Sequence, residues 1–385
     1  MRISYVTETW PPEINGVALT ASRTVAWLRE RGHTVGLIRP RQRDEAMRDD
    51  HDEWRTAGMP IPLYPDLRLG LATVATLQRR FAAAPPDLVH VSTPGPLARA
   101  AVLAARRLGL PVTADFRTNF HSYSRYYWLG ALEPLVWRYL RGLHNRADCT
   151  FVPMQRLAAE LAAKGFARTE VVGRGVDTAL FCPTRRSPGL RESWGAADDD
   201  PVLLYVGRLA REKNVSLALH AFNMVRYLRP RTRMVVVGDG PLRRGLQREF
   251  PAALFVGNRR GEELASHYAS ADLFVFPSES ETFGNVTLEA LASGLPVVGF
   301  ERAAIAEYVR DGCNGGVVAA GDESAFIRTV CNTVARDDLL PSMRLQARRT
   351  ALTARWDLVL TRFEHLLERT VLRHRPDHAR DVALA

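Results

Sequence analysis

The segment 278–290 places two carboxylates at a predicted strand-to-helix turn. The run Ala271–Pro277 is apolar and predicts a strand, and Val286–Ala292 predicts a helix. Glu281 and Glu289, eight positions apart, lie on either side of the turn between them. Such a turn offers a ligand backbone N–H groups, a helix N-terminus and two anionic acceptors. A phosphate can bind the N–H groups, and the hydroxyls of a sugar or ribose can bind the carboxylates.

Two cations follow another predicted strand. Arg208 comes directly after the strand Val202–Gly207, and Lys213 lies five positions later on a loop that leads to the predicted helix Val215–Tyr227. Arg can bind two oxygens side by side and Lys acts as a point charge, so the pair suits a pyrophosphate. The alternative interpretation is two solvated surface cations.

Four weaker candidates also follow predicted strands. Gly238, in a Gly-Asp-Gly-Pro turn, permits a tight turn and close approach of a ligand, and Val256 is a candidate wall for a nucleobase. Gly16, in an Asn-Gly turn, could bring its N–H close to a phosphate. His121, soon after the strand Pro111–Phe116, could donate to a leaving phosphate or hold a sugar hydroxyl. Ordinary turns and a structural histidine are the alternatives.

The elements that must position these residues form an α/β pattern. Short β-branched runs alternate with helical patterns throughout, which predicts two doubly wound parallel sheets that face each other across a cleft. The first set of predicted strands is Ile3–Thr7, Thr34–Ile38, Asp87–Ser92, Pro111–Phe116, Cys149–Pro153 and Glu170–Gly173. The second set is Val202–Gly207, Arg233–Gly238, Leu254–Gly257, Leu273–Pro277, Pro296–Phe300 and Gly316–Ala319. Ligands of open α/β sheets bind at the carboxyl ends of the strands, where the candidate residues lie.

The domain boundary is expected at the Pro-, Gly- and Arg-rich stretch Phe181–Gly189. We therefore predict an N-terminal domain over residues 1–182, a linker over 183–200 and a C-terminal domain over 201–355. The segment 356–374 reads as a helix that packs back on the N-terminal domain, and the tail after it is expected to be loose.

Composition narrows the function classes. The 385 residues carry a net charge of +10, almost entirely from Arg, since only Lys164 and Lys213 are lysines. This excess reflects either Arg-rich codon usage or a function that needs attraction to an anionic surface. Nucleic acid is not expected as that partner, because the chain shows no nucleic-acid-binding motif. Four isolated cysteines without zinc-like spacing indicate a reducing compartment. Without a signal-peptide pattern or a long apolar run, we expect a cytoplasmic protein, or one that lies on the inner face of the cytoplasmic membrane.

Together these motifs resemble the family 4 retaining glycosyltransferases of the GT-B fold. The resemblance covers roughly Ile3 to Trp356 and rests on the order of the Asn-Gly loop, the segment Arg174–Asp177, Arg208 with Lys213, the Gly-Asp-Gly turn and the two glutamates. It is closest to the branch of GDP-mannose-dependent α-mannosyltransferases and sulfoquinovosyl-diacylglycerol synthases. Many relatives carry Gly-Gly where this chain has Asn15-Gly16.

The resemblance implies a role for each matching residue. Arg208 and Lys213 would bind the donor diphosphate, Glu289 the ribose hydroxyls, and Glu281 the hydroxyls of the transferred sugar. His121 would contact the sugar near its reacting carbon, and Gly16 would approach the β-phosphate. The implied catalytic set is His121, Glu281, Arg208 and Lys213. The implied donor-binding set is Gly16, Arg208, Lys213, Gly238, Val256, Glu281, Phe283, Gly284, Asn285 and Glu289.

These roles make a divalent metal unnecessary, because the cations and the helix N-terminus can stabilise the departing diphosphate. We therefore expect no cofactor and no metal. The segments Asp50–Asp52 and Asp198–Asp200 superficially fit an Asp-x-Asp metal motif, but both lie in polar loops and are read as solvated. No carboxylate nucleophile is evident.

The segment 132–144 predicts an amphipathic helix on the acceptor side. One face carries Leu132, Leu135, Val136, Tyr139, Leu140 and Leu143, and the other carries Trp137, Arg138, Arg141 and His144. The cationic face, preceded by the aromatic segment Arg125–Leu129, either faces solvent or rests on an anionic membrane surface. The Pro-rich segment Met59–Pro65 is expected to be a second apolar loop near the acceptor.

The leading hypothesis is a hexosyltransferase that moves a sugar from a UDP- or GDP-linked donor to a lipid or lipid-linked acceptor. One alternative is a transferase for surface polysaccharide or a soluble glycoconjugate. A sugar-nucleotide epimerase of the same fold is a further alternative, but the acid and base carboxylates that such an enzyme needs are not evident in this sequence. A hypothesis of another class is a non-catalytic nucleotide-sugar-binding protein, which the intact Arg208, Lys213, Glu281 and Glu289 argue against.

Overall fold

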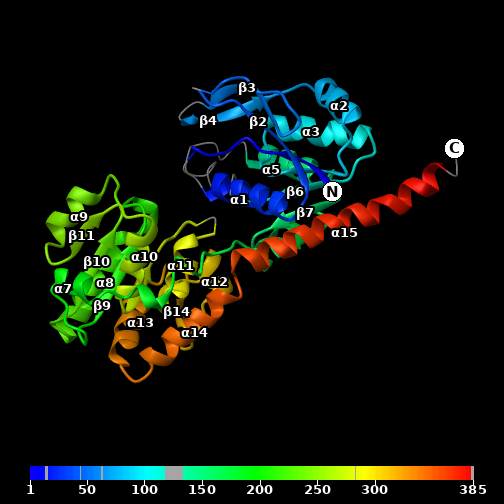
Figure 1. Cartoon of the computed structure of the whole chain (residues 1–385). Coiled ribbons are helices and arrows are strands. Elements are labelled where there is room, and N and C mark those ends of the chain that lie inside the picture. The colour runs from blue at the N-terminus through cyan, green and yellow to red at the C-terminus, as the bar shows by residue number, and fades with distance from the viewer. Residues whose placement is uncertain (14–15, 44, 62–63, 118–132, 282, 383–385) are drawn as a thin grey trace. The chain divides into compact units, whose positions relative to one another are not determined.

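The computed structural model describes residues 1–13, 16–43, 45–61, 64–117, 133–281 and 283–382 (Figure 1). The chain divides into two compact units: unit 1 comprises Met1–Gly173 with Val359–Ala385, and unit 2 comprises Arg174–Leu358. Each unit has its own sheet flanked by helices, so the predicted α/β architecture with two doubly wound sheets is confirmed.

The sheet of unit 1 has the strand order β4-β3-β2-β1-β5-β6-β7-β8 in the part of the chain that the structure describes. Neighbouring strands from β3 to β8 pair in parallel. The strands are β1 (Arg2–Val6), β2 (Thr34–Pro40), β3 (Glu53–Ile61), β4 (Tyr64–Leu71), β5 (Leu88–Val91), β6 (Val112–Asp115), β7 (Cys149–Val152) and β8 (Thr169–Val171).

Two helical layers bury the faces of this sheet. Apolar residues of α2 (Val74–Ala83), α3 (Pro96–Arg107) and α5 (Glu133–His144) form one core with β1, β2, β5 and β6. On a second core, α1 (Gly16–Glu30) packs with the long C-terminal helix α15 (Trp356–Val382). The helix α6 (Gln155–Ala163) completes a smaller cluster with α5 and β7. The polar loops at the strand ends are thus held on a closely packed base.

An antiparallel edge on this sheet was not predicted. β3 pairs with β4 in antiparallel register, for example Met59 with Leu69, where the sequence suggested a loop over Met59–Pro65. The prolines in this stretch argued against strands, because proline cannot donate a ladder hydrogen bond. The pairing is compatible with proline for two reasons. Pro65 lies on β4, which is the edge strand and offers one side to solvent, and Pro60 of β3 lies beyond the residues Glu53–Thr56 that pair with β2.

The sheet of unit 2 is entirely parallel in its described part, with the order β11-β10-β9-β12-β13-β14. Its strands are β9 (Val202–Val206), β10 (Arg233–Val237), β11 (Leu254–Gly257), β12 (Leu273–Phe276), β13 (Val297–Phe300) and β14 (Gly315–Val318). Its helices are η2 (Pro183–Arg185), α7 (Pro188–Ser193), η3 (Arg211–Lys213), α8 (Val215–Leu228), α9 (Arg243–Glu249), α10 (Gly261–Ser270), α11 (Asn285–Ala292), α12 (Ala303–Tyr308), α13 (Glu323–Ala335) and α14 (Leu340–Leu352). Its central strands β9 and β12 are wholly buried, which explains their continuous apolar sequences.

The division between the units falls at Gly173, and the expected linker 183–200 belongs to unit 2. It forms η2 and α7, and its side chains bind the end of α10. Arg191, itself buried, donates to Asp272 Oδ2 at 2.9 Å, and Arg186 donates to Asp272 Oδ1 at 3.1 Å. Composition suggested a linker, and these arginines fix the segment to unit 2. After Leu358, α15 returns to unit 1, where Phe363 and Leu367 are buried.

No helix in the described part of the chain combines the length and the apolar composition that a membrane span requires. The four cysteines are all unpaired.

Candidate active site

The predicted cation Lys213 and the predicted acceptor Glu281 are in direct contact in unit 2. Lys213 ends the short helix η3 after β9, and its Nζ forms an ion pair with Glu281 Oε1. The same Nζ lies 3.4 Å from the Ser280 carbonyl oxygen. Both side chains are mostly buried, with exposed fractions of 18% and 15%. The parallel strands β9 and β12 are neighbours, so their following loops meet at one edge of the sheet.

Gly284 directly precedes the helix α11 as its N-cap, in a conformation that favours glycine. Its φ of 83° is left-handed, and it supplies no side chain to cap the helix. The first N–H groups of α11, starting at Asn285, therefore stand beside the Glu281 side chain, whose Cγ would lie 3.7 Å from a Cβ at Gly284. The Phe283 ring is buried against Tyr308, so Phe283 offers a ligand its backbone alone. This arrangement can bind an anion at the helix N-terminus.

The second predicted cation, Arg208, lies on the same loop as Lys213 but is more exposed. Its guanidinium forms an ion pair with Glu212, four residues later, and its side chain is 66% exposed. Burial alone would raise the pKa of Glu212, but hydrogen bonds and the charges of Arg208 and Lys213 lower it below its ordinary value. Glu212 also accepts the Glu279 N–H on its carbonyl at 3.1 Å, which ties the two loops together.

Glu289 has a different environment from Glu281. It lies on α11, and its Oε2 accepts a hydrogen bond of 3.0 Å from the Tyr268 hydroxyl on α10. Burial raises the pKa of Glu289 to about 7, and the Tyr268 hydrogen bond opposes this rise. Tyr268 could not be predicted from the sequence, because no spacing rule connects a residue on one helix with a carboxylate on the next.

Tyr205 lies beneath these residues on β9. Its hydroxyl donates to the Arg208 carbonyl at 3.3 Å, and its ring lies 6.0 Å from that of Phe276. Burial, with the negative charges of Glu281 and Glu212, raises the pKa of Tyr205 far above its ordinary value. Tyr205 therefore remains a neutral hydroxyl that supports the Arg208 loop. Tyr205 was not predicted from the sequence, and Glu212, although it belongs to the Glu-Lys pair of the motif, was given no role there; the four-residue spacing from Arg208 to Glu212 was a readable signal of their contact.

Gly238 and Val256 lie on neighbouring strand ends of the same sheet. Gly238 has a φ of 136°, and a Cβ there would lie 2.0 Å from the Gly207 carbonyl oxygen. The glycine is thus required by the backbone that carries Arg208, whatever a ligand does. Val256 is partly exposed on the edge strand β11.

Two predicted residues belong to unit 1. Gly16 is the first residue of α1, and its carbonyl accepts the Thr20 hydroxyl at 2.7 Å. His121 lies outside the described residues, as do Asn15 and the aromatic segment Arg125–Leu129. Both assignments remain predictions.

The two Asp-x-Asp segments are engaged in local contacts. Asp50 accepts the N–H groups of Asp52 and Glu53, and Arg231 pairs with Asp199 and Asp200. Among the described residues, metal-ligating atoms converge only at His33, Glu364 and Glu368. Glu364 there already binds Arg31, His33 and Trp27, so this cluster fastens α15 to unit 1.

The helix α5 has the predicted position, but the expected division of its faces was wrong at several residues. His144, expected on the cationic face, is 1% exposed, and burial lowers its pKa to about 4. Leu135 and Tyr139, expected on the buried face, are 50% and 38% exposed. An amphipathic pattern cannot distinguish a buried neutral histidine from a cation. The predicted buried face was therefore shifted by one residue from the observed one.

Comparison with known proteins identifies the family. Residues 14–180 match the family described as Glycosyltransferase Family 4, and residues 200–336 match Glycosyl transferases group 1. A GDP-mannose-dependent alpha-mannosyltransferase of Mycolicibacterium smegmatis is 35% identical over 97% of this chain and 100% of its own length. The chain belongs to the family 4 glycosyltransferases. This glycosyltransferase is a hexosyltransferase that uses a nucleotide sugar, as its family membership establishes.

Other relatives of the glycosyltransferase have names that describe transfer of a sulfosugar or synthesis of a glycolipid. The sulfoquinovosyl transferase SQD2 of Arabidopsis thaliana is 32% identical over 77% of this chain and 59% of its own length. An alpha-monoglucosyldiacylglycerol synthase of Streptococcus pneumoniae is 29% identical over 77% of this chain and 70% of its own. The predicted branch is thereby confirmed. The structure of HepE from Anabaena in complex with UDP has a TM-score of 0.74 at 19% identity, over 96% of this chain and all of HepE, which confirms the GT-B fold.

Proposed function

We propose that this glycosyltransferase moves mannose from GDP-mannose to a lipid or lipid-linked acceptor, with retention of anomeric configuration and without a metal. The observation that carries the proposal is the contact of Lys213 with Glu281 beside the uncapped N-terminus of α11. A cation, the backbone N–H groups of a helix N-terminus and a carboxylate together fit a phosphate next to a sugar hydroxyl. GDP-mannose is favoured over UDP-sugars by the name of the relative that matches over nearly the whole chain.

In this scheme, the residues of unit 2 hold the donor and stabilise its departure. Lys213, Arg208 and the first turn of α11 neutralise the charge that develops on the leaving diphosphate. Lys213 must then exchange part of its contact with Glu281 for the phosphate, which frees Glu281 to accept hydroxyls of the sugar. Glu289 accepts the hydroxyls of the ribose. Because two cations already face the diphosphate, activity should persist in EDTA, and a strict requirement for Mg²⁺ or Mn²⁺ would refute the metal-free part.

A donor screen tests the leading identity. Ligands that bind the folded protein raise its apparent melting temperature by mass action. We expect GDP-mannose to raise Tm more than UDP-glucose or ADP-glucose does at equal concentration. NMR analysis of the product formed with GDP-mannose should show the α-anomer. Binding without hydrolysis or transfer to any lipid acceptor would favour the non-catalytic alternative.

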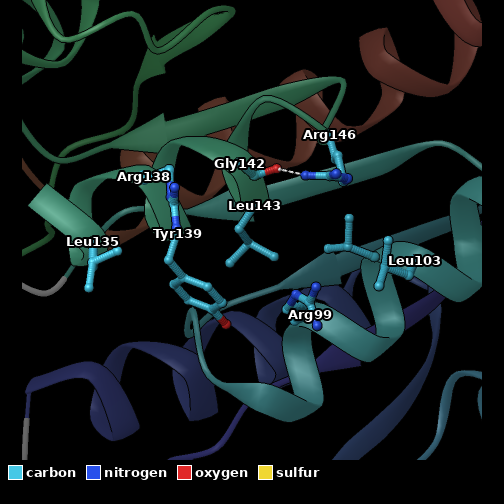
Figure 2. Close-up of a pocket in the computed structure, with 9 residues that line it drawn as sticks. Arg99, Leu103, Leu135, Arg138, Tyr139, Gly142, Leu143 and Arg146 are labelled. Carbon is cyan, nitrogen blue, oxygen red and sulfur yellow. Dashed lines mark hydrogen bonds between the residues drawn. The ribbon is translucent and has the colours of Figure 1, made fainter.

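A groove between α3 and α5 supports the lipid and membrane part of the proposal (Figure 2). It has a volume of about 270 Å³, and Arg99, Arg138 and Arg146 line it together with apolar residues that include Leu103 and Leu135. Tyr139 extends from α5 to the Pro94 carbonyl at 2.9 Å, just before α3. Among the described residues, neither Arg99 nor Arg138 has an ion-pair partner. Guanidinium groups above apolar side chains suit the phosphates and upper acyl carbons of anionic lipids.

Vesicle flotation tests this surface. A basic residue near an anionic membrane contributes about 1 kcal/mol, so R99A/R138A/R146A should reduce binding to phosphatidylglycerol vesicles by about 100-fold. The control R79A/R226A/R244A removes the same charge from exposed arginines elsewhere and should bind far better than the groove variant. Equal losses in both variants would indicate attraction by net charge alone, and equal binding to neutral phosphatidylcholine would contradict an electrostatic surface.

A further inference from the structure

The hydroxyl of Tyr268 is held rigidly against one oxygen of Glu289. Tyr268 is fully buried on α10, and its ring contacts Phe181 and Phe274 at centroid distances of 5.7 Å each. From this position, its hydroxyl donates to Glu289 Oε2 at 3.0 Å. Because packing on two sides fixes the ring, the hydroxyl loses little further freedom when it makes this hydrogen bond.

The two oxygens of Glu289 are not equivalent. Within the described part of the chain, Oε1 accepts no hydrogen bond, and the side chain is partly exposed. One oxygen is thus occupied by protein and the other is open to a ligand. A carboxylate accepts hydroxyl hydrogens well only when it is ionised, because its protonated form has a donor in place of an acceptor.

We propose that Tyr268 is a positioning residue for donor binding, whose hydroxyl holds Oε2 of Glu289, leaves Oε1 for the ribose and favours the ionised carboxylate. The inference rests on the proposed function, in which Glu289 binds the ribose. It adds a residue outside the nucleotide-binding turn, and it predicts how donor binding depends on pH.

The elements packed around α11 provide no cation for Glu289. Helix α11 has no other charged residue, and β13 has none. On α14, Arg348 donates instead to the Ala292 carbonyl at the far end of α11, and Arg344 binds Asp272. Arg349, also on α14, forms no ion pair with Glu289 in the described structure. The remaining titratable groups on α10, β9 and α12 are Glu262, Glu263, His267, Tyr205, Glu307 and Tyr308, and none forms an ion pair with Glu289 in the described structure. Ionisation of Glu289 thus depends chiefly on burial, which opposes it, and on Tyr268, which supports it.

The expected pH dependence follows from this balance. The pKa of Glu289 is about 7, so the carboxylate is mostly protonated below that pH and mostly ionised above it. Donor affinity should therefore rise as the pH increases through 7. If the Tyr268 hydroxyl is removed, the pKa should rise further, and the midpoint of the affinity profile should move to higher pH by about one unit.

The test measures binding of GDP-mannose without acceptor by calorimetry between pH 6 and 8.5. This probe carries no phosphate group that titrates in the range, because both phosphates are esterified. Wild type should show a midpoint near pH 7, and Y268F, which keeps the ring, should show one near pH 8. The affinity of Y268F should fall by about tenfold at pH 6.5 and by less at pH 8.5. Y308F, which removes a tyrosine hydroxyl of unit 2 that has no described hydrogen-bond partner, should keep the wild-type midpoint.

A double-mutant cycle separates the inference from the proposed function. E289Q should bind GDP-mannose more weakly than wild type at pH 8, and its affinity should no longer change with a midpoint near pH 7. In the E289Q background, Y268F should lower the affinity only slightly further. Unchanged affinity in E289Q would overturn the ribose role and the inference with it. A loss in E289Q together with an unmoved midpoint in a folded Y268F, checked by thermal unfolding, would overturn the role of Tyr268 alone. If the affinity of the wild-type protein for GDP-mannose does not change between pH 6 and 8.5, the proposed role of Tyr268 is overturned without any substitution.

Discussion

Each unit holds a glutamate whose pKa is raised to about 7 by desolvation, Glu8 in unit 1 and the partly exposed Glu289 in unit 2, and the two differ in what surrounds them. In unit 1, Glu8 follows β1 and accepts the Leu97 N–H at 2.9 Å and the Thr93 hydroxyl at 3.3 Å. A Cβ at Gly95 would lie 1.7 Å from Glu8 Oε2, so the protein closes tightly over this carboxylate. In unit 2, Glu289 has one partner, Tyr268, and one open oxygen.

The difference shows that a raised pKa does not by itself identify a ligand site. Glu8 is a structural cap, because one of its oxygens accepts the Leu97 N–H in the first turn of α3 and the other accepts the Thr93 hydroxyl. Glu289 has spare acceptor capacity and lies about one helix turn from the N-terminus of α11. Perturbed groups indicate function only when their geometry leaves room for a ligand. The comparison predicts that substitutions in the turn of unit 2 change donor binding, whereas substitution of Glu8 changes stability.

The largest expected effect comes from Lys213. K213A removes the ammonium that contacts Glu281 and faces the proposed diphosphate, so kcat/KM for GDP-mannose should fall by about 100-fold. Calorimetry with GDP should also show weaker binding, because the charge acts on the diphosphate itself. K164A is the matched control, since Lys164 is the other lysine and lies over Trp137 in unit 1. Unchanged affinity for GDP in K213A would refute the cation assignment.

Glu281 should have the next largest effect. E281A removes a sugar contact and leaves Lys213 without its carboxylate, so turnover should fall at least about tenfold while GDP binds as well or better. The opposite changes in turnover and GDP affinity distinguish a sugar contact from a phosphate contact. Steady-state rates with calorimetry on the same protein measure both, and near-normal turnover would refute the assigned role.

Glu8 should affect stability and not donor binding. Its folded-state pKa is about 7 against an ordinary value of 4.5, so the folded state binds the proton more tightly. The stability this provides is fully present below about pH 4.5 and is lost as the pH rises through 7, at a cost of about 3 kcal/mol. E8Q is neutral throughout, so its Tm relative to wild type should be higher at pH 8 than at pH 5 by about 5 °C. A relative Tm independent of pH would show that Glu8 is not the group described.

The sequence predicted the sheets well because their buried strands are continuous apolar runs, as in β9 and β12. It missed β3 and β4, where prolines obscure an edge hairpin. The composition of 183–200 also predicted a linker. It does not reveal that Arg186 and Arg191 both bind Asp272 and thereby hold this segment in unit 2.

At the candidate site, Lys213 and Glu281 could be predicted because each follows a recognisable strand, and parallel neighbours bring such loops together. Their mutual ion pair could not be predicted, since residues 68 positions apart carry no signal of contact. Tyr268 was missed for a similar reason: as part of a helical pattern it looks like an ordinary core aromatic. The roles of Gly16 and His121 are still predictions from resemblance.

The smallest expected effect concerns Glu212, to which the sequence motif assigned no role. It pairs with Arg208 at an exposed position, where such pairs contribute about 0.2–1 kcal/mol. A diphosphate must compete with Glu212 for this guanidinium, so E212Q should bind GDP about threefold more tightly. In the R208A background, E212Q should change GDP affinity much less, because the contested cation is gone. Weaker binding by E212Q alone would mean that Glu212 orients Arg208 toward the diphosphate, and the turn of unit 2 would then be preorganised by its acid as well as by Tyr268.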